Sequence, residues 1–138
     1  MIGIGLQASE SHSPLKALDD PLVLSAMKRA WMQSGAGTTG VEATFRLDGS
    51  PSDYQIVAAR RTNQIRNQNV PIIPGTTFAV FHIHPLGTEP DPSPNDVRVA
   101  DKYGFRIYTM HHRGLYEYDP VTRKTTKLLH GLRWLKRR

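Results

Sequence analysis

The chain has 138 residues, the size of one ordinary domain and enough to bury a hydrophobic core without disulfides. Hydrophobic residues make up 38% of it and charged residues 22%, a balance that argues against wholesale disorder. The sequence contains no cysteine. A disulfide framework, a thiolate zinc finger and a cysteine nucleophile are therefore excluded.

The formal net charge of +6 is distributed unevenly along the chain. Residues 98–138 contain eleven Lys or Arg against three acids (+8), whereas residues 1–97 contain seven against nine (−2). We expect residues 130–138 to form a basic C-terminal tail. Such a tail solubilises a chain or docks on acidic partners or phosphate, so one alternative is a nucleic-acid-binding domain that uses the basic C-terminal part.

Capping and turn residues divide the first half of the chain. Asp20-Pro21 is typical of an N-cap followed by proline at the first helical position, and an apolar stripe from Val23 to Trp31 follows at helical spacing. We predict the following elements: an irregular N-terminal segment over 1–19, a helix over 21–34, strands over 41–48 and 54–59 with a turn at 48–51 between them, and a crossing loop over 60–75.

The second half begins with the most apolar segment, 76–83, which predicts a central strand buried on both faces. Ser93-Pro94 repeats the cap-plus-proline pattern and predicts a helix to about Tyr103. Three further strands are expected over 105–110, 114–118 and 124–129. The fold class is therefore α/β (α+β), with a single mixed β-sheet flanked by helices in one domain over 20–129.

The pattern that carries chemistry lies at the end of the central strand. Side chains two apart on a strand point to the same face, so His82 and His84 can present two imidazoles to one ion while Ile83 points into the core. Pro85 ends the strand directly after the pair. A lone His-x-His is more often an ordinary pair of histidines than a metal site, so the residues that follow decide the interpretation.

Those residues return the chain to a helix N-terminus, where Asp96 can be a third ligand. Three protein ligands leave a tetrahedral zinc ion one open position for water, which is the catalytic rather than the structural arrangement. Zinc lowers the pKa of such a water to about 7. A nearby carboxylate is then needed to take its proton and to deliver one to the leaving group.

The residues His82-x-His84-Pro85, then Ser93 and Asp96, resemble the JAMM motif of the JAB/MPN metalloprotease superfamily, with a loop before Ser93 that is one residue longer than usual. The resemblance covers about residues 20–120 and implies a cytidine-deaminase-like, MPN-type architecture. It implies that His82, His84 and Asp96 bind one Zn²⁺ per chain. It further implies that Glu42 is the general base and that Ser93 donates a hydrogen bond to the oxyanion.

The implied reaction is hydrolysis of a peptide or isopeptide amide, and the compact length is similar to that of prokaryotic members. The implied partners are a peptide or protein substrate, including the tail of a ubiquitin-like or sulfur-carrier protein. No apolar run is long enough to span a membrane, and the N-terminus has no basic leader, so we expect a cytoplasmic protein, with delivery as a toxin-like effector domain as the alternative. A non-catalytic MPN-like binding module is a competing function.

Each site residue also has a structural interpretation. Ser93 with an acid three positions on is typical of a capping box, which is compatible with the functional role because an N-cap serine leaves its O–H free to donate. The rivals of Glu42 as the base are Glu10, which precedes the helix, and the loop acids Glu89 and Asp91, which we expect to be solvated.

The aromatic residues of the C-terminal part have more than one possible role. His111 and His112 fall in a predicted turn, where we expect them to be exposed, with a second metal site or a place beside the substrate as alternatives. Trp134, beside leucines at three-residue spacing, can anchor a short amphipathic helix on the body of the domain or on a partner.

Overall fold

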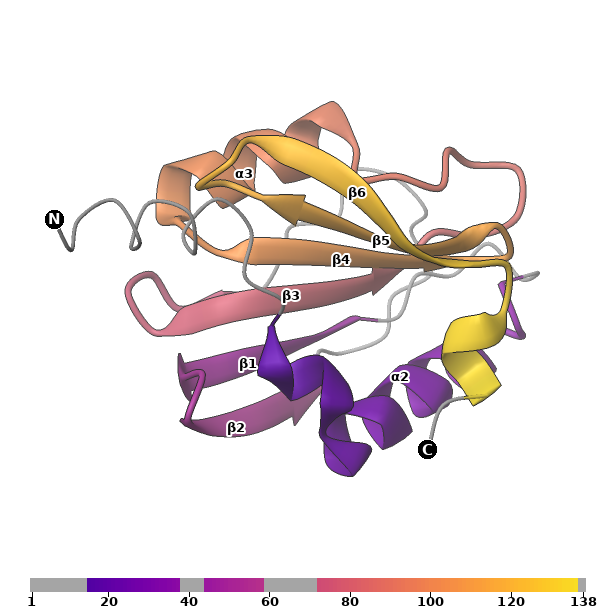
Figure 1. Ribbon diagram of the computed structural model, residues 1–138, viewed down its shortest axis with the longest axis horizontal. Coiled ribbons are helices and arrows are strands. Elements are labelled where there is room, and N and C mark those ends of the chain that lie inside the picture. The colour runs from indigo at the N-terminus through magenta and orange to yellow at the C-terminus, as the bar shows by residue number, and fades with distance from the viewer. Residues whose placement is uncertain (1–14, 38–43, 59–71, 137–138) are drawn as a thin grey trace, which may run out of the picture.

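The computed structural model describes residues 15–37, 44–58 and 72–136, which form one six-stranded sheet with helices on both faces (Figure 1). The elements follow in this order: η1 (Lys16–Asp19), α2 (Pro21–Gln33), β1 (Thr44–Ser50), β2 (Asp53–Ala58), β3 (Thr77–Ile83), α3 (Pro94–Tyr103), β4 (Arg106–His111), β5 (Gly114–Asp119), β6 (Lys124–His130) and η2 (Arg133–Lys136). The expected α/β (α+β) class with a single mixed sheet is confirmed. Among the described residues, no helix combines the length and hydropathy needed to cross a membrane.

The strand order is β2-β1-β3-β4-β5-β6. Only β3 and β4 are parallel among these neighbours, because α3 forms the crossover between them, while the remaining pairs are antiparallel. The strand β3 has two neighbours, and six of its seven residues are buried. The prediction of a central strand buried on both faces is therefore confirmed.

Two apolar layers cover the two faces of the sheet. Helix α2, η1 and η2 pack on one face against side chains such as Phe45, Phe81 and Met110, and the Phe81 ring stacks on both Phe45 and Tyr108. Helix α3 packs on the other face, where Ala100 contacts a smaller cluster formed around Val80, Ile107 and Tyr118. Helix α3 covers only part of that face, and the polar residues discussed below lie at the end of β3 on the same side.

Both helices begin as the sequence predicts. The Asp20 carboxylate accepts a hydrogen bond from the Leu22 N–H (2.8 Å), with Pro21 in the first turn of α2. Ser93 caps α3, and Gly104 ends it in the left-handed conformation with φ 75°. These ends are predictable because each depends on side chains within three residues of the helix terminus.

The hairpin turn lies further along the chain than predicted. Gly49 and Ser50 belong to β1, Ser50 pairs with Asp53, and Pro51 and Ser52 form the turn. A side chain at Gly49 would place its Cβ only 2.5 Å from the Asp53 carbonyl oxygen. Gly49 therefore permits close approach of the two strands rather than the reversal of the chain. The predicted crossing loop, 60–75, lies mostly outside the described residues.

The basic C-terminal part contributes to the core. Trp134, in η2, is fully buried, and its ring packs edge-on against Trp31 of α2 with centroids 5.2 Å apart. Leu132 and Leu135 pack beside it. Of the two alternatives for Trp134, the structure shows an anchor on the body of the domain itself.

Candidate metal centre

Strand β3 places the two histidines on the face of the sheet that carries α3. His82 pairs in register with Thr109 of β4, and the ladder continues beyond it because the His84 N–H donates to the Met110 carbonyl (2.9 Å). His82 is 2% exposed and His84 8% exposed, while Ile83 between them is fully buried on the opposite face. The predicted alternation, with the imidazoles on one face and the apolar side chain in the core, is confirmed.

Asp96 reaches the histidines from the first turn of α3. The Ser93 Oγ accepts a hydrogen bond from the Asp96 N–H (3.1 Å), and the Asp96 Oδ2 accepts one from the Ser93 N–H (2.9 Å). This reciprocal pair is the capping box that the sequence predicts. It also fixes the Asp96 side chain, which is buried, and it leaves the Ser93 hydroxyl hydrogen free of the cap.

The three side chains that the sequence singles out lie close together. His84 Nε2 is 3.4 Å from Asp96 Oδ2, and His82 Nε2 is 3.9 Å from Asp96 Oδ1. Donor atoms bound to one tetrahedral zinc at about 2.0–2.1 Å would be roughly 3.3–3.4 Å apart. The first distance meets this value and the second exceeds it by about half an ångström. As placed, no three His, Asp or Glu side chains within 15–37, 44–58 and 72–136 form a group that could hold an ion.

The tautomer of His84 follows from its second contact. His84 Nδ1 lies 2.9 Å from the Glu89 carbonyl oxygen. A carbonyl oxygen can only accept, so Nδ1 carries the hydrogen and neutral His84 has its lone pair on Nε2. That lone pair faces a carboxylate oxygen at 3.4 Å. A cation between these two acceptors, either a proton or a metal ion, would turn this contact into an attraction.

The electrostatics of Asp96 favour the carboxylate form. Burial, the largest influence, would raise its pKa, but the hydrogen bond with His84, the electrostatic influence of His82 and the Ser93 N–H together outweigh it. The pKa of the Asp96 carboxyl is held well below its ordinary range as a result. Asp96 is consequently a negatively charged group at neutral pH, as a cation ligand must be.

The loop between His84 and Ser93 is held against the sheet. The Thr109 hydroxyl donates to the Pro90 carbonyl (2.6 Å), and the Thr88 hydroxyl donates to the Pro85 carbonyl (2.6 Å). The loop acids Glu89 and Asp91 are exposed, so the prediction that they are solvated is confirmed.

Glu42, the predicted general base, lies outside the described residues, as does its rival Glu10. The described residues on either side of it border the site. Thr44, two positions later, is the register partner of His82. Gly37, five positions earlier, accepts a hydrogen bond from the Leu86 N–H (2.7 Å), in the loop that follows His84.

The prediction that His111 is exposed is wrong, because β4 continues through His111 and buries it to 3% exposure. Its Nδ1 accepts a hydrogen bond from the Arg113 N–H (3.0 Å), so the neutral ring carries its hydrogen on Nε2. Burial, followed by the charges of His112, His84 and Arg113, lowers the pKa of His111. His112 is half-buried, with its ring centroid 5.0 Å from that of Trp31. No signal in the sequence marks this burial, which depends on the length of β4.

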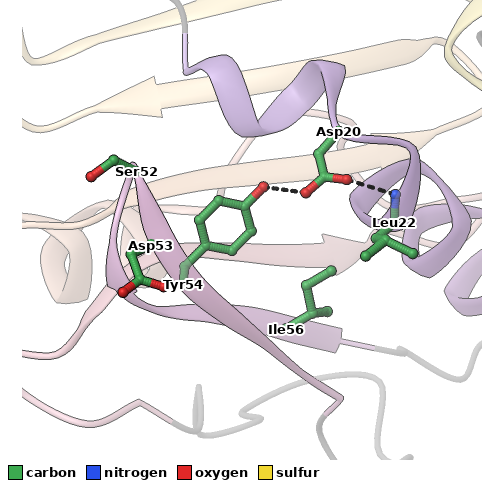
Figure 2. A pocket seen from close by; sticks show the side chains of 6 residues that line it. All are labelled: Asp20, Leu22, Ser52, Asp53, Tyr54 and Ile56. Carbon is green, nitrogen blue, oxygen red and sulfur yellow. Dashed lines mark hydrogen bonds between the residues drawn. The ribbon is translucent and has the colours of Figure 1, made fainter.

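A pocket of about 520 Å³ lies between the β1–β2 hairpin and the start of α2 (Figure 2). The Tyr54 hydroxyl donates to Asp20 there, and burial together with this bond raises the pKa of Tyr54 to about 12. The antiparallel register places this pocket at the far end of the sheet from the histidines, since Asp48 pairs with Thr77 at the start of β3. Its contacts stabilise the start of α2 and lie apart from the candidate metal centre.

Comparisons with protein-family models, curated proteins and solved structures find no match to this chain. The resemblance to the JAB/MPN superfamily stays a prediction that rests on the residues themselves.

Proposed function

We propose that the protein is a zinc-dependent amide hydrolase that cleaves a peptide or isopeptide bond. The observation that carries this proposal is the arrangement at His84, whose Nδ1–H is committed to the Glu89 carbonyl while its Nε2 faces the Asp96 carboxylate at 3.4 Å. Ligating histidines almost always donate their other ring N–H in this way. His82, His84 and Asp96 would hold the ion, and binding would require the side chains to move closer together, because His82 Nε2 lies 3.9 Å from the nearer Asp96 oxygen.

The donor set fits zinc, because two imidazoles and one carboxylate are a common combination in catalytic zinc sites. When bound, the ion supplies a Lewis acid that makes water acidic enough to act at neutral pH. Glu42 would take the proton of the attacking water and deliver it to the leaving amine. The Ser93 hydroxyl, whose oxygen already accepts from the Asp96 N–H, would donate its hydrogen to the substrate oxygen that becomes negative.

Metal analysis of protein purified without a histidine tag tests the first step. We expect about one zinc per chain in the wild type and a loss of that zinc in the double variant His82→Ala/His84→Ala. An exposed histidine, His130→Ala, is the matched control and should keep the metal. Wild-type protein that binds no zinc even when the ion is supplied in excess would exclude this function.

The substrate class is the second step of the proposal. The tail of a ubiquitin-like or sulfur-carrier protein is the substrate to assay first, alongside unrelated peptides. Glu42→Gln should retain the metal and lose hydrolysis by at least about 100-fold, the lower range for a general base. Full activity of this variant would remove Glu42 from the role of base and leave the metal centre itself unaffected.

The same contacts favour one other function specifically. If a proton rather than a metal ion lies between His84 and Asp96, the pair is an internal ion pair, and a chain that holds no metal there would fit a non-catalytic binding module. That alternative predicts a metal-free protein whose thermal stability does not change when zinc is added. A metalloprotein would instead gain stability with zinc concentration, because the ion binds the folded state.

A further inference from the structure

The loop that fixes His84 is itself fixed by a residue of the neighbouring strand. Thr109 is fully buried in β4, and its hydroxyl donates to the Pro90 carbonyl at 2.6 Å. Thr109 is also the register partner of His82, so its side chain is on the same face as both histidines. One hydrogen bond thus connects strand β4 to the loop between His84 and Ser93.

The carbonyl held by Thr109 directly follows the carbonyl held by His84. Two backbone dihedrals of Pro90, φ and ψ, separate the peptide plane that contains the Glu89 oxygen from the plane that contains the Pro90 oxygen. The proline ring locks φ near −65°. The Glu89 oxygen lies 2.9 Å from His84 Nδ1. When the Pro90 oxygen is held in place, rotation about ψ of Pro90 is the one soft motion that can turn the Glu89 oxygen away from His84.

We propose that Thr109 is a positioning residue for the candidate metal centre: through Pro90 it holds the Glu89 carbonyl that keeps the hydrogen of His84 on Nδ1 and the lone pair on Nε2. Its value for zinc binding rests on the proposed function, whereas its effect on the tautomer does not. A purely structural hydroxyl would stabilise the loop without changing which nitrogen of His84 carries the hydrogen.

Nitrogen NMR of the His84 ring in metal-free protein tests this directly, at a pH where the ring is neutral. In the wild type we expect one protonated nitrogen, Nδ1, and one unprotonated nitrogen, Nε2. Thr109→Val removes the hydroxyl at nearly constant volume and should produce a mixture of both tautomers. Thr109→Ser keeps the hydroxyl and should restore the wild-type spectrum, while Thr126→Val, on the exposed face of β6, should leave the spectrum unchanged.

Zinc affinity, measured by competition with a chelator, is the second measurement. Loss of an outer-shell partner typically weakens a metal site roughly 10–100-fold, and Thr109→Val should raise the Kd for zinc about 10-fold while Thr109→Ser changes it little. Thr109→Ala replaces the valine variant if the added methyl group prevents folding.

The outcomes separate the two proposals. A His84 tautomer that is the same in Thr109→Val as in the wild type overturns the positioning role, whatever the protein does with zinc. If the wild type binds no zinc but the tautomer of His84 changes as expected between the wild type and Thr109→Val, the positioning role is supported and the zinc-dependent function is excluded. A fold that unravels in the valine and alanine variants, with a serine variant that folds yet shows mixed tautomers, also overturns the role of the hydroxyl.

Discussion

Replacing Trp134 with alanine should destabilise the whole domain, although this residue belongs to the basic C-terminal part. Its side chain is fully buried, and truncation of such an aromatic residue costs about 3–5 kcal/mol through lost transfer free energy and the cavity left behind. The perpendicular contact with Trp31 at 5.2 Å is part of what is lost, since such pairs contribute about 0.5–1.5 kcal/mol. The total free energy of unfolding of a domain of this kind is roughly 5–15 kcal/mol.

The Trp134→Phe variant separates packing from the polar N–H. The indole Nε1 is buried and has no hydrogen-bond partner within the described residues, and an unsatisfied buried donor costs about 1–3 kcal/mol. Phenylalanine removes that donor and keeps most of the ring. Its cavity cost is therefore largely offset, and we expect the free energy of unfolding to fall by less than about 1.5 kcal/mol, no more than half the effect of alanine.

Urea denaturation monitored by far-ultraviolet circular dichroism gives the free energy of unfolding of both variants. Trp31 provides a fluorescence signal that survives the substitution. Val121→Ala is the control, because Val121 is 74% exposed and its truncation should change the free energy of unfolding by no more than about 0.5 kcal/mol. A loss below about 1 kcal/mol for Trp134→Ala would show that η2 does not dock on α2 in solution, and the residues 130–138 would then be the independent tail that the charge pattern predicts.

Two further predictions concern hydrogen bonds at helix N-termini. Ser93→Ala should lower the free energy of unfolding by about 1 kcal/mol through loss of the cap, whereas Ser93→Asp, whose carboxylate accepts but does not donate, should keep the cap and that stability. If the Ser93 hydroxyl stabilises the oxyanion, both variants lose hydrolysis by about 100–1,000-fold, and an aspartate variant with full activity would contradict that role. The Tyr54 hydroxyl and the Leu22 N–H lower the pKa of Asp20 in the folded protein. At a pH above the unfolded pKa of about 4, the ionised Asp20 therefore stabilises the fold. This stabilisation is lost as the pH falls through the lowered pKa of the folded state. Tyr54→Phe should therefore shrink the difference in Tm between pH 7 and pH 2.5, and an unchanged difference would exclude the contact.

The elements that could be predicted from the sequence are those whose causes are local. The N-caps Asp20 and Ser93, the C-cap Gly104 and the apolar run of β3 each act within a few residues, and the structure has them where the sequence predicts them. The exposure of Glu89 and Asp91 was also predictable, because a carboxylate in a surface loop stays in water unless a partner offsets the cost of its burial.

The predictions that failed, and the alternatives for Trp134 that were left open, depend on how strands pair and how separate elements pack. The burial of His111 requires β4 to extend to its last residue beside the end of β3, and the turn at Pro51 and Ser52 requires Gly49 to lie against Asp53 within the paired strands. The partner of Trp134 is Trp31, more than a hundred positions earlier. Alternating hydrophobicity and charge counts contain no information about such pairings.

The candidate metal centre combines local causes with a contact from a neighbouring strand. Its sequence pattern is informative because the local causes act within one short segment. His84 and Asp96 are twelve positions apart, and backbone groups of the same short segment hold both of them: the Glu89 carbonyl orients the ring and the Ser93 N–H orients the carboxylate. A carboxylate has lone pairs for both the cap and an ion, so the capping box would not compete with ligation and would hold Asp96 in position for it. Thr109, by contrast, enters from β4 and stabilises the same loop across the sheet. A motif in sequence can therefore specify the candidate ligands and their local orientation, while the residue that keeps the loop on the sheet becomes visible only in the folded chain.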